Sequence, residues 1–129
     1  MRPKNFQLDH YLPWSFVGHD RLWNLVPVSA EANRQKGDRL PPASCLAGLA
    51  HVQALGLAQA RRTLEPGQLG RLLEPFIEDL RIDLSDLRQL EGPGLEECLQ
   101  KAYEGVVRPL SDLARAHGYI EWRRTGFSS

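Results

Sequence analysis

The pattern of hydrophobic positions divides the chain into two parts near residue 41. Before that point the apolar residues form short extended runs, interrupted by prolines and rich in aromatic side chains, without a helical period. These runs predict a strand at residues 5–10 and a second at 24–28, where Pro27 confines the strand to an edge or a bulge. The intervening residues 11–23 are too many for a tight hairpin, so we expect a compact loop there.

A short helix is expected directly after the second strand. Ser29 is a favourable N-cap, and Glu31 places an acidic side chain in the first turn, where it complements the helix dipole. Gly37 follows Lys36 and is a natural stop. The N-terminal part is therefore predicted to be strand, loop, strand and short helix.

The rest of the chain has the three-and-four spacing of amphipathic helices. Helices are expected at about 42–62, at 69–80 with a kink at Pro75, at 85–90, and at 95–114 with a bend near Gly105 and Pro109. Their apolar stripes predict an antiparallel bundle packed against the N-terminal part, because the first 41 residues are too few to hold a core alone. The sequence thus predicts an α+β fold whose two segments, 1–41 and 42–129, form one compact unit.

Composition is that of an ordinary globular domain. The 129 residues are 42% hydrophobic and 25% charged, which excludes a disordered or collagenous chain. The formal net charge is zero, so binding to nucleic acid would depend on a local patch. Residues 1–40 carry six basic and four acidic side chains, so basic charge leans toward the N-terminal part.

Two features bear on the location of the protein. Residues 40–60 lack charged side chains and have about the length of a membrane span, but their Pro, Gly, His and Gln residues favour a buried helix of a soluble protein. Cys45 and Cys98 are expected to be buried, reduced thiols, because small secreted folds usually carry several disulfides. We therefore expect a cytoplasmic protein with no membrane partner.

Candidate chemistry concentrates between residues 9 and 36. Asp9 and His10 are neighbours at the end of a predicted strand, so their side chains diverge, and one can bind a metal while the other addresses a nucleophile. Asn33 and Lys36 are three apart in the short helix and share one face. Asp9 and Asn33 offer a few hard oxygen ligands, which suits a Mg²⁺ ion that keeps most of its waters and shares a substrate phosphate. An imidazole such as that of His10 can take a proton from an attacking water, because histidine titrates near neutral pH.

These residues and their spacing resemble the HNH nuclease motif, the ββα-metal finger, in the variant whose third position is Asn. The gaps of fourteen residues from His10 to Asn24 and of nine from Asn24 to Asn33 are similar to those of the HNH domains of Cas9-type nucleases. The resemblance covers about residues 5–41 and carries no information about the helical segment. It implies an endonuclease that hydrolyses phosphodiester bonds of DNA, with RNA left open as a substrate.

The resemblance also implies a role for each residue of the motif. Asp9 and Asn33 would hold a single Mg²⁺, with Mn²⁺ as an alternative, and His10 would be the general base. Asn24 would tie the loop and orient the site, while Lys36 would meet the scissile phosphate or its neighbour. Three arginines near the motif are further candidate phosphate contacts: Arg21, Arg34 and Arg39.

The chain departs from parts of the family, and a second function stays open. Many HNH domains have His where this chain has Asn33, and the cysteine-bound zinc that braces some of them is not expected, because both cysteines lie outside the motif. A protein partner or a larger nuclease system, of which this chain would be a subunit or the C-terminal part, would supply specificity. The alternative is a non-catalytic helical interaction or DNA-docking module that keeps the finger as a scaffold, which the neutral charge and the helical tail favour. The intact Asp9, His10 and Asn33 favour the nuclease.

Overall fold

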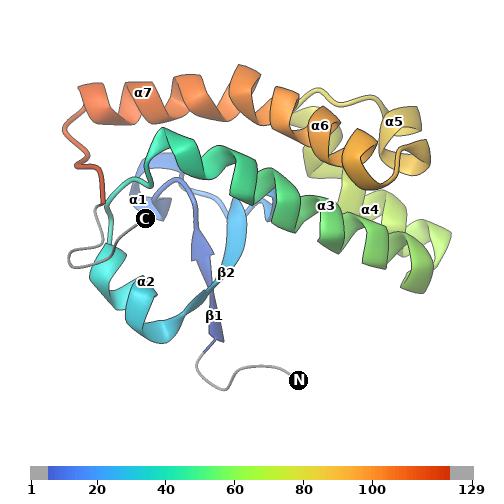
Figure 1. Cartoon of the computed structure of the whole chain (residues 1–129), viewed down its shortest axis with the longest axis horizontal. Coiled ribbons are helices and arrows are strands. Elements are labelled where there is room, and N and C mark those ends of the chain that lie inside the picture. Colours follow the sequence, from blue (N-terminus) through green and yellow to red (C-terminus); the bar gives the residue numbers. More distant parts are fainter. Residues whose placement is uncertain (1–5, 123–129) are drawn as a thin grey trace.

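A small two-stranded sheet with one short helix lies on one side of the molecule, and longer helices run across it (Figure 1). The structure is a computed structural model that describes residues 6–122, and for Phe6, Ala30 and Asn33 it describes the backbone alone. The predicted α+β fold class, a ββα unit followed by helices, is confirmed.

The sheet joins β1 (Phe6–His10) to β2 (Leu25–Ser29) in antiparallel register. The first strand lies where the sequence predicts it, with residue 5 outside the described residues, and the second is shifted by one residue, because Asn24 belongs to a turn that precedes it and Ser29 still pairs with β1. Pro27 cannot donate a ladder hydrogen bond, and this two-stranded sheet of the described chain tolerates it because each strand is an edge.

The connection between the strands is the expected compact loop, with two short helical pieces inside it. These are α1 (Trp14–Val17) and the 3-10 helix η1 (Leu22–Asn24). Gly18 ends α1 in the left-handed region, with φ of +70°, and its N–H donates to the Trp14 carbonyl. The loop therefore turns back before η1 leads into β2.

The short helix α2 (Ala30–Lys36) follows β2 directly. Its N-cap is Ser29, as predicted, because the Ser29 Oγ accepts the N–H of Ala32 at 3.1 Å. Gly37, with φ of +55°, provides the left-handed residue that stops the helix. These two local signals in the sequence thus place this helix correctly.

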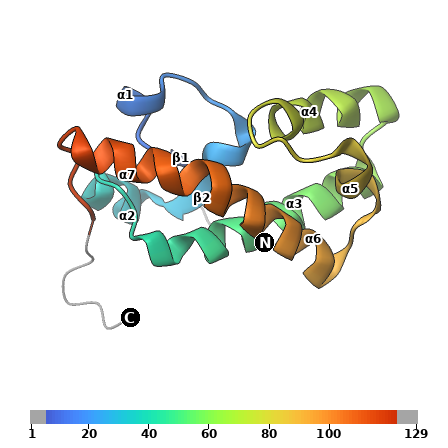
Figure 2. The same cartoon turned by 90° about the horizontal axis from the view of Figure 1, so that it is seen from above.

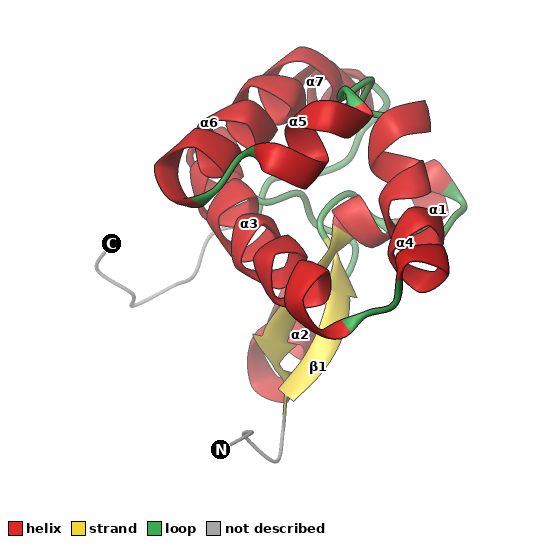
Figure 3. Cartoon of the chain, turned by 90° about the vertical axis from the view of Figure 1, so that its right-hand side faces the viewer, coloured by secondary structure: helices red, strands yellow, loops and turns green. Residues whose placement is uncertain are grey.

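Helices make up most of the remaining described chain. They are η2 (Ala43–Cys45, a 3-10 turn), α3 (Leu46–Thr63), α4 (Pro66–Glu78), α5 (Leu84–Gln89), α6 (Gly92–Ala102), η3 (Tyr103–Val107, a π-helical turn) and α7 (Arg108–Ala116). Helix α3 runs antiparallel to the segment of α6 and α7, and α3 packs against α6 (Figures 1 and 2). Helices α4 and α5 lie at the C-terminal end of α3 (Figures 1 and 3).

The expected bend of the last helix takes the form of the π-helical turn η3, which lies between α6 and α7 in one continuous helical run. Pro109 follows this turn and cannot donate a backbone hydrogen bond to the preceding turn, as a bend at this place requires. Tyr103 and Val107, at the two ends of the turn, are both fully buried. Helix α4 continues through Pro75 as one element, and the kink there stays a prediction.

The cysteines do not match the expectation of two buried thiols. Cys45 is exposed, because it lies in the turn η2 and not on the buried face of α3, and Cys98 is half-buried. Both are free, and partial desolvation raises the pKa of each thiol, so the thiols stay protonated at neutral pH. Within residues 6–122, none of the helices combines the length and the hydropathy of a membrane span.

The helices hold the segment before β2 by its backbone. Gln53 of α3 donates from Nε2 to the carbonyls of Leu22, at 3.1 Å, and Leu25, at 2.8 Å. The hydroxyl of Tyr103 in η3 donates to the carbonyl of Trp23 at 2.9 Å. Burial raises the pKa of Tyr103, so its phenol stays neutral and able to donate. We call these three hydrogen bonds the backbone clamp, and they fix the path that leads into β2.

The C-terminal end of the described chain also returns to the N-terminal part. The N–H of the fully buried Leu40 donates to the carbonyl of Ile120 at 2.8 Å, and the Leu40 carbonyl accepts the N–H of Trp122 at 2.6 Å. Near this bridge the ring of Tyr119 meets the ring of Phe16 edge-on, with centroids 5.5 Å apart. The ββα unit is therefore in contact with both ends of the helical segment.

A chain that ends after Pro41 is expected to unfold or aggregate. Truncation removes the backbone clamp and exposes Leu12, Trp23 and Leu40, which are buried in the full chain. A fragment of this size has no other source of a core. The measurement is an NMR spectrum of residues 1–41 beside that of the full chain, and well-dispersed resonances from the fragment would contradict the prediction.

Candidate active site

Asn24 ties the connection between the strands together from inside. Its side chain is fully buried, its Oδ1 accepts the N–H of Leu12 at 2.8 Å, and its Nδ2 donates to the Leu12 carbonyl at 3.0 Å. The backbone carbonyl of Asn24 accepts the N–H of Tyr11 at 2.7 Å. The two residues that follow His10 are thus fixed against the entrance to β2.

Replacing Asn24 by alanine is expected to destabilise the fold. The substitution leaves the N–H and the carbonyl of the buried Leu12 without partners, and each buried unsatisfied group costs about 1–3 kcal/mol. We therefore expect the free energy of unfolding to fall by about 2–6 kcal/mol. Urea unfolding followed by tryptophan fluorescence measures it, with Gln89→Ala, which removes an exposed amide from α5, as the control. Equal stability of the two variants would show that the bonds of Asn24 contribute nothing.

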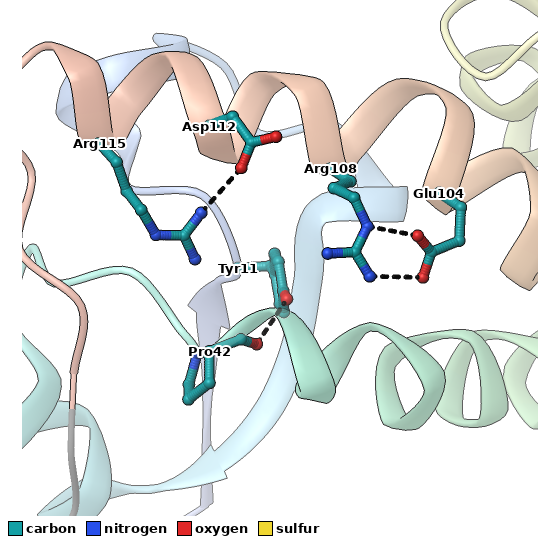
Figure 4. Close-up of polar contacts among 6 residues, drawn as sticks. All are labelled: Tyr11, Pro42, Glu104, Arg108, Asp112 and Arg115. Carbon is teal, nitrogen blue, oxygen red and sulfur yellow. Dashed lines mark hydrogen bonds and ion pairs between the residues drawn. The ribbon is translucent and has the colours of Figure 1, made fainter.

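Tyr11 anchors the chain directly after His10. It is buried, its hydroxyl donates to the carbonyl of Pro42 at 3.4 Å, and burial raises the pKa of the phenol. Four charged side chains of the η3–α7 run lie beside it as two ion pairs, Glu104 with Arg108 and Asp112 with Arg115 (Figure 4). The end of β1 is therefore held between the start of the helical segment and its last helix.

Asp9 and Lys36 form a buried ion pair at the end of β1. The Nζ of Lys36 lies 3.1 Å from Asp9 Oδ2 and donates to the carbonyl of His10 at 3.0 Å. Both residues are buried, and the pair joins the last residue of α2 to the strand. The predicted role of Lys36 at a phosphate stays a prediction, and in this structure its ammonium group holds Asp9 and the backbone of the next residue.

His10 has a partner that the sequence did not reveal. Its Nε2 lies 2.7 Å from Oδ1 of Asp20, which comes ten residues later in the connection between the strands. The His10 side chain is 26% exposed, so its ring remains accessible to solvent. Asp9 and His10 therefore engage different partners, Lys36 and Asp20, as expected for neighbours whose side chains diverge from a strand.

The residues on either side of Asp20 are held in place. The N–H of Arg21 donates to Nδ1 of His19 at 3.2 Å, and the His19 ring meets Trp23 edge-on at 5.4 Å. The guanidinium of Arg21 lies 3.1 Å from Oδ2 of Asp79, which also accepts the Nε1–H of Trp23 at 2.8 Å. Asp79 follows α4, so the helical segment sets the position of the turn that carries Asp20.

The three arginines predicted as phosphate contacts lie in different surroundings. Arg34 is in α2 and exposed, and Arg39 is exposed after α2, where its guanidinium donates to the Gln35 carbonyl at 3.1 Å. Arg21 is half-exposed and paired with Asp79 and, at 3.8 Å, with Glu78. Contact with phosphate stays a prediction for all three, and Arg21 already has acidic partners.

The predicted metal site at Asp9 and Asn33 stays a prediction. Asp9 supplies a carboxylate, and Asn33 lies in α2, the helix that brings Lys36 to the same carboxylate; the side chain of Asn33 is outside what the structure describes. Among the side chains that are described, no three His, Cys, Asp or Glu residues gather into a metal cluster. A divalent ion at Asp9 would share that carboxylate with Lys36.

Comparison with known proteins finds matches for the N-terminal third of the chain. Residues 1–42 match the family model described as HNH endonuclease. The CRISPR-associated endonuclease Cas9 of Listeria innocua serovar 6a is 45% identical over 38 residues, which is 30% of this chain and 3% of the relative. No solved structure matches the chain. The resemblance drawn from the motif is confirmed for this segment, and the chain matches a small part of that relative.

Proposed function

We propose, from the premise that residues 1–42 are an HNH endonuclease segment, that this chain is a metal-dependent endonuclease that hydrolyses phosphodiester bonds of DNA. The observation that carries the proposal is the match to that family over the same residues that meet at the end of β1. There the Lys36 ammonium group contacts the Asp9 carboxylate and the backbone carbonyl of His10. The side chain of Asn24 fixes Leu12, just after His10. A nuclease-type function is supported at this level, and the roles below are proposals.

His10 is proposed as the general base. Its imidazole takes a proton from a water, the resulting hydroxide forms a bond to phosphorus, and the bond from phosphorus to the 3′ oxygen breaks, with a proton from solvent ending on that oxygen. Mg²⁺ bound by Asp9 and Asn33 would stabilise the charge that grows on the phosphate and on the leaving oxygen, and Mn²⁺ would do the same. Lys36 places a cation at this end of the strand and orients Asp9 through the 3.1 Å ion pair.

The proposed substrate path crosses α2 and the residues after it. Arg34 and Arg39 are exposed there, close in sequence to Lys36, and would contact phosphates on either side of the scissile bond. Such contacts position the nucleic acid without reading its sequence. A larger nuclease assembly would therefore supply specificity, in keeping with a relative of which this chain matches only a small part. The free thiols of Cys45 and Cys98 support a cytoplasmic location.

Incubation of the full chain with supercoiled plasmid tests the proposed activity. Nicked or linear DNA is expected with Mg²⁺ or Mn²⁺ and not with EDTA, and the His10→Ala protein purified in the same way controls for a contaminating nuclease. Retarded migration of the plasmid without metal-dependent cleavage would overturn the nuclease and support the alternative, a docking module that keeps the finger as a scaffold.

A further inference from the structure

We propose that Asp20 is a positioning residue for His10: it holds the proton of the imidazole on Nε2 and so leaves Nδ1 as the atom that accepts a proton. The inference deepens the proposed function and depends on it, because the proton that Nδ1 accepts is that of the attacking water. The observation behind it is the 2.7 Å contact between His10 Nε2 and Asp20 Oδ1.

The chemistry of the two groups decides which nitrogen carries the proton. An ionised carboxylate only accepts hydrogen bonds, so the ring nitrogen that faces it must be the donor. A neutral imidazole has one N–H, so donation from Nε2 leaves Nδ1 with a free lone pair. The same contact fixes the rotation of the ring about its side chain, and a base must be oriented as well as deprotonated.

The position of Asp20 is set by its neighbours and not by the pair itself. Arg21, the next residue, is bound to Asp79 at the end of α4, and its N–H donates to the ring of His19 on the other side of Asp20. His19 in turn meets the buried Trp23. The carboxylate is therefore presented to His10 by a turn with attachments on both sides.

The contact between His10 and Asp20 contributes little to the stability of the fold. The Asp20 side chain is 72% exposed, and exposed ion pairs contribute little to stability because solvent screens them. Removing it therefore leaves the protein folded, so a loss of activity in an Asp20 variant would report on His10. Asp9 and Lys36, at the same strand end, form a buried ion pair, so replacing either of them would also destabilise the fold.

The chain offers a matched comparison outside the site. His51 of α3 faces Glu96 of α6 through Nδ1 at 2.9 Å, so a second exposed histidine is paired with a carboxylate through the opposite ring nitrogen. By the same argument, neutral His51 carries its proton on Nδ1. Glu96→Ala, which removes the acceptor as Asp20→Ala does, is then the control for the loss of a histidine–carboxylate pair away from β1.

The first measurement is the tautomer of each histidine, read from the imidazole nitrogen resonances of the ¹⁵N-labelled full chain about two units above the ordinary histidine pKa. We expect the proton of His10 on Nε2 and that of His51 on Nδ1. Asp20→Ala should move the His10 resonances toward the average of the two tautomers and leave those of His51 unchanged. Glu96→Ala should do the reverse.

The second measurement is plasmid cleavage by the same proteins. Asp20→Ala is expected to lower kcat by about 10- to 100-fold, by analogy with the loss of a carboxylate that orients a metal-bound histidine, with KM unchanged. Glu96→Ala should cleave as the wild-type chain does. A merely structural role for Asp20 would instead lower the fraction of folded protein and leave the His10 tautomer as it was.

The outcomes separate this inference from the proposed function. If the wild-type chain cleaves and Asp20→Ala matches it in kcat or in the His10 tautomer, the role of Asp20 is overturned and the nuclease stands. A wild-type His10 with its proton on Nδ1 overturns the inference in the same way. If the wild-type chain does not cleave with metal, the proposed function fails, and the catalytic role of Asp20 fails with it.

Discussion

Replacing His10 by alanine should reduce plasmid cleavage by about 10²- to 10⁴-fold, the contribution of a general base. The binding of Mg²⁺ or Mn²⁺ should survive, because the substitution leaves Asp9 and Asn33 in place. It also keeps the backbone carbonyl of His10, which accepts a hydrogen bond from Lys36, so the support of Asp9 is retained. Single-turnover cleavage rates and calorimetric titration with Mn²⁺ give the two readings.

The control for His10→Ala is His51→Ala, which removes another partly exposed, carboxylate-paired imidazole from the surface. It should cleave at the wild-type rate. Should His10→Ala cleave at that rate as well, His10 is not the base, and the assignment of the whole site fails. Loss of metal binding in His10→Ala would mean that the imidazole is itself a ligand.

Replacing Asp9 by asparagine should abolish both metal binding and cleavage while the fold survives. Asp9 is the only anionic ligand in the proposed pair. Replacing a residue that merely supports a metal ligand lowers metal affinity by about 10- to 100-fold, so replacing the ligand itself should lower it by more than about 100-fold. Bound metal supplies several kcal/mol of charge stabilisation, so cleavage should fall by about 10³-fold or more. Titration with Mn²⁺ and plasmid cleavage measure these losses.

The choice of asparagine over alanine at position 9 follows from the buried ion pair. Alanine would leave the buried ammonium of Lys36 without its charge partner, and breaking a buried pair from one side costs about 3–5 kcal/mol. The asparagine amide oxygen can still accept from Nζ. Asp112→Asn, which removes one charge from the exposed pair with Arg115 on α7, is the matched control. Unchanged metal affinity in Asp9→Asn would place the ion elsewhere.

Local signals were sufficient for the N-terminal elements. Pro27, the Ser29 cap and the Gly37 stop each act within a few residues, and β2 and α2 lie where these signals place them. The bend near Gly105 and Pro109 was predicted from these residues, but its form as a π-helical turn at 103–107 was not, because no residue type specifies that form. Expectations that depended on tertiary packing, such as the burial of Cys45, were the ones that were wrong.

The candidate site shows the same difference between features set by local sequence and features set by tertiary packing. Asp9, His10 and Lys36 could be selected from their places at a strand end and on a helix face, which are local geometry, whereas Asn24 was selected from the resemblance to the HNH motif. Asp20 could not be selected, because its contact with His10 depends on the path of the loop between the strands. That path is set by the contact of Arg21 with Asp79, which comes 58 residues after Arg21. Its only sequence signal is a carboxylate in the connection between the two strands.

The backbone clamp has a consequence for grafting. Gln53 and Tyr103 bind main-chain carbonyls, which every amino-acid sequence carries, so the clamp recognises the path of the loop and is indifferent to its side chains. An HNH segment from another protein, with a connection of the same length between its strands, would present the same three acceptors. A grafted segment needs matching side chains where side chains make the joint, as Arg21 and Trp23 do at Asp79.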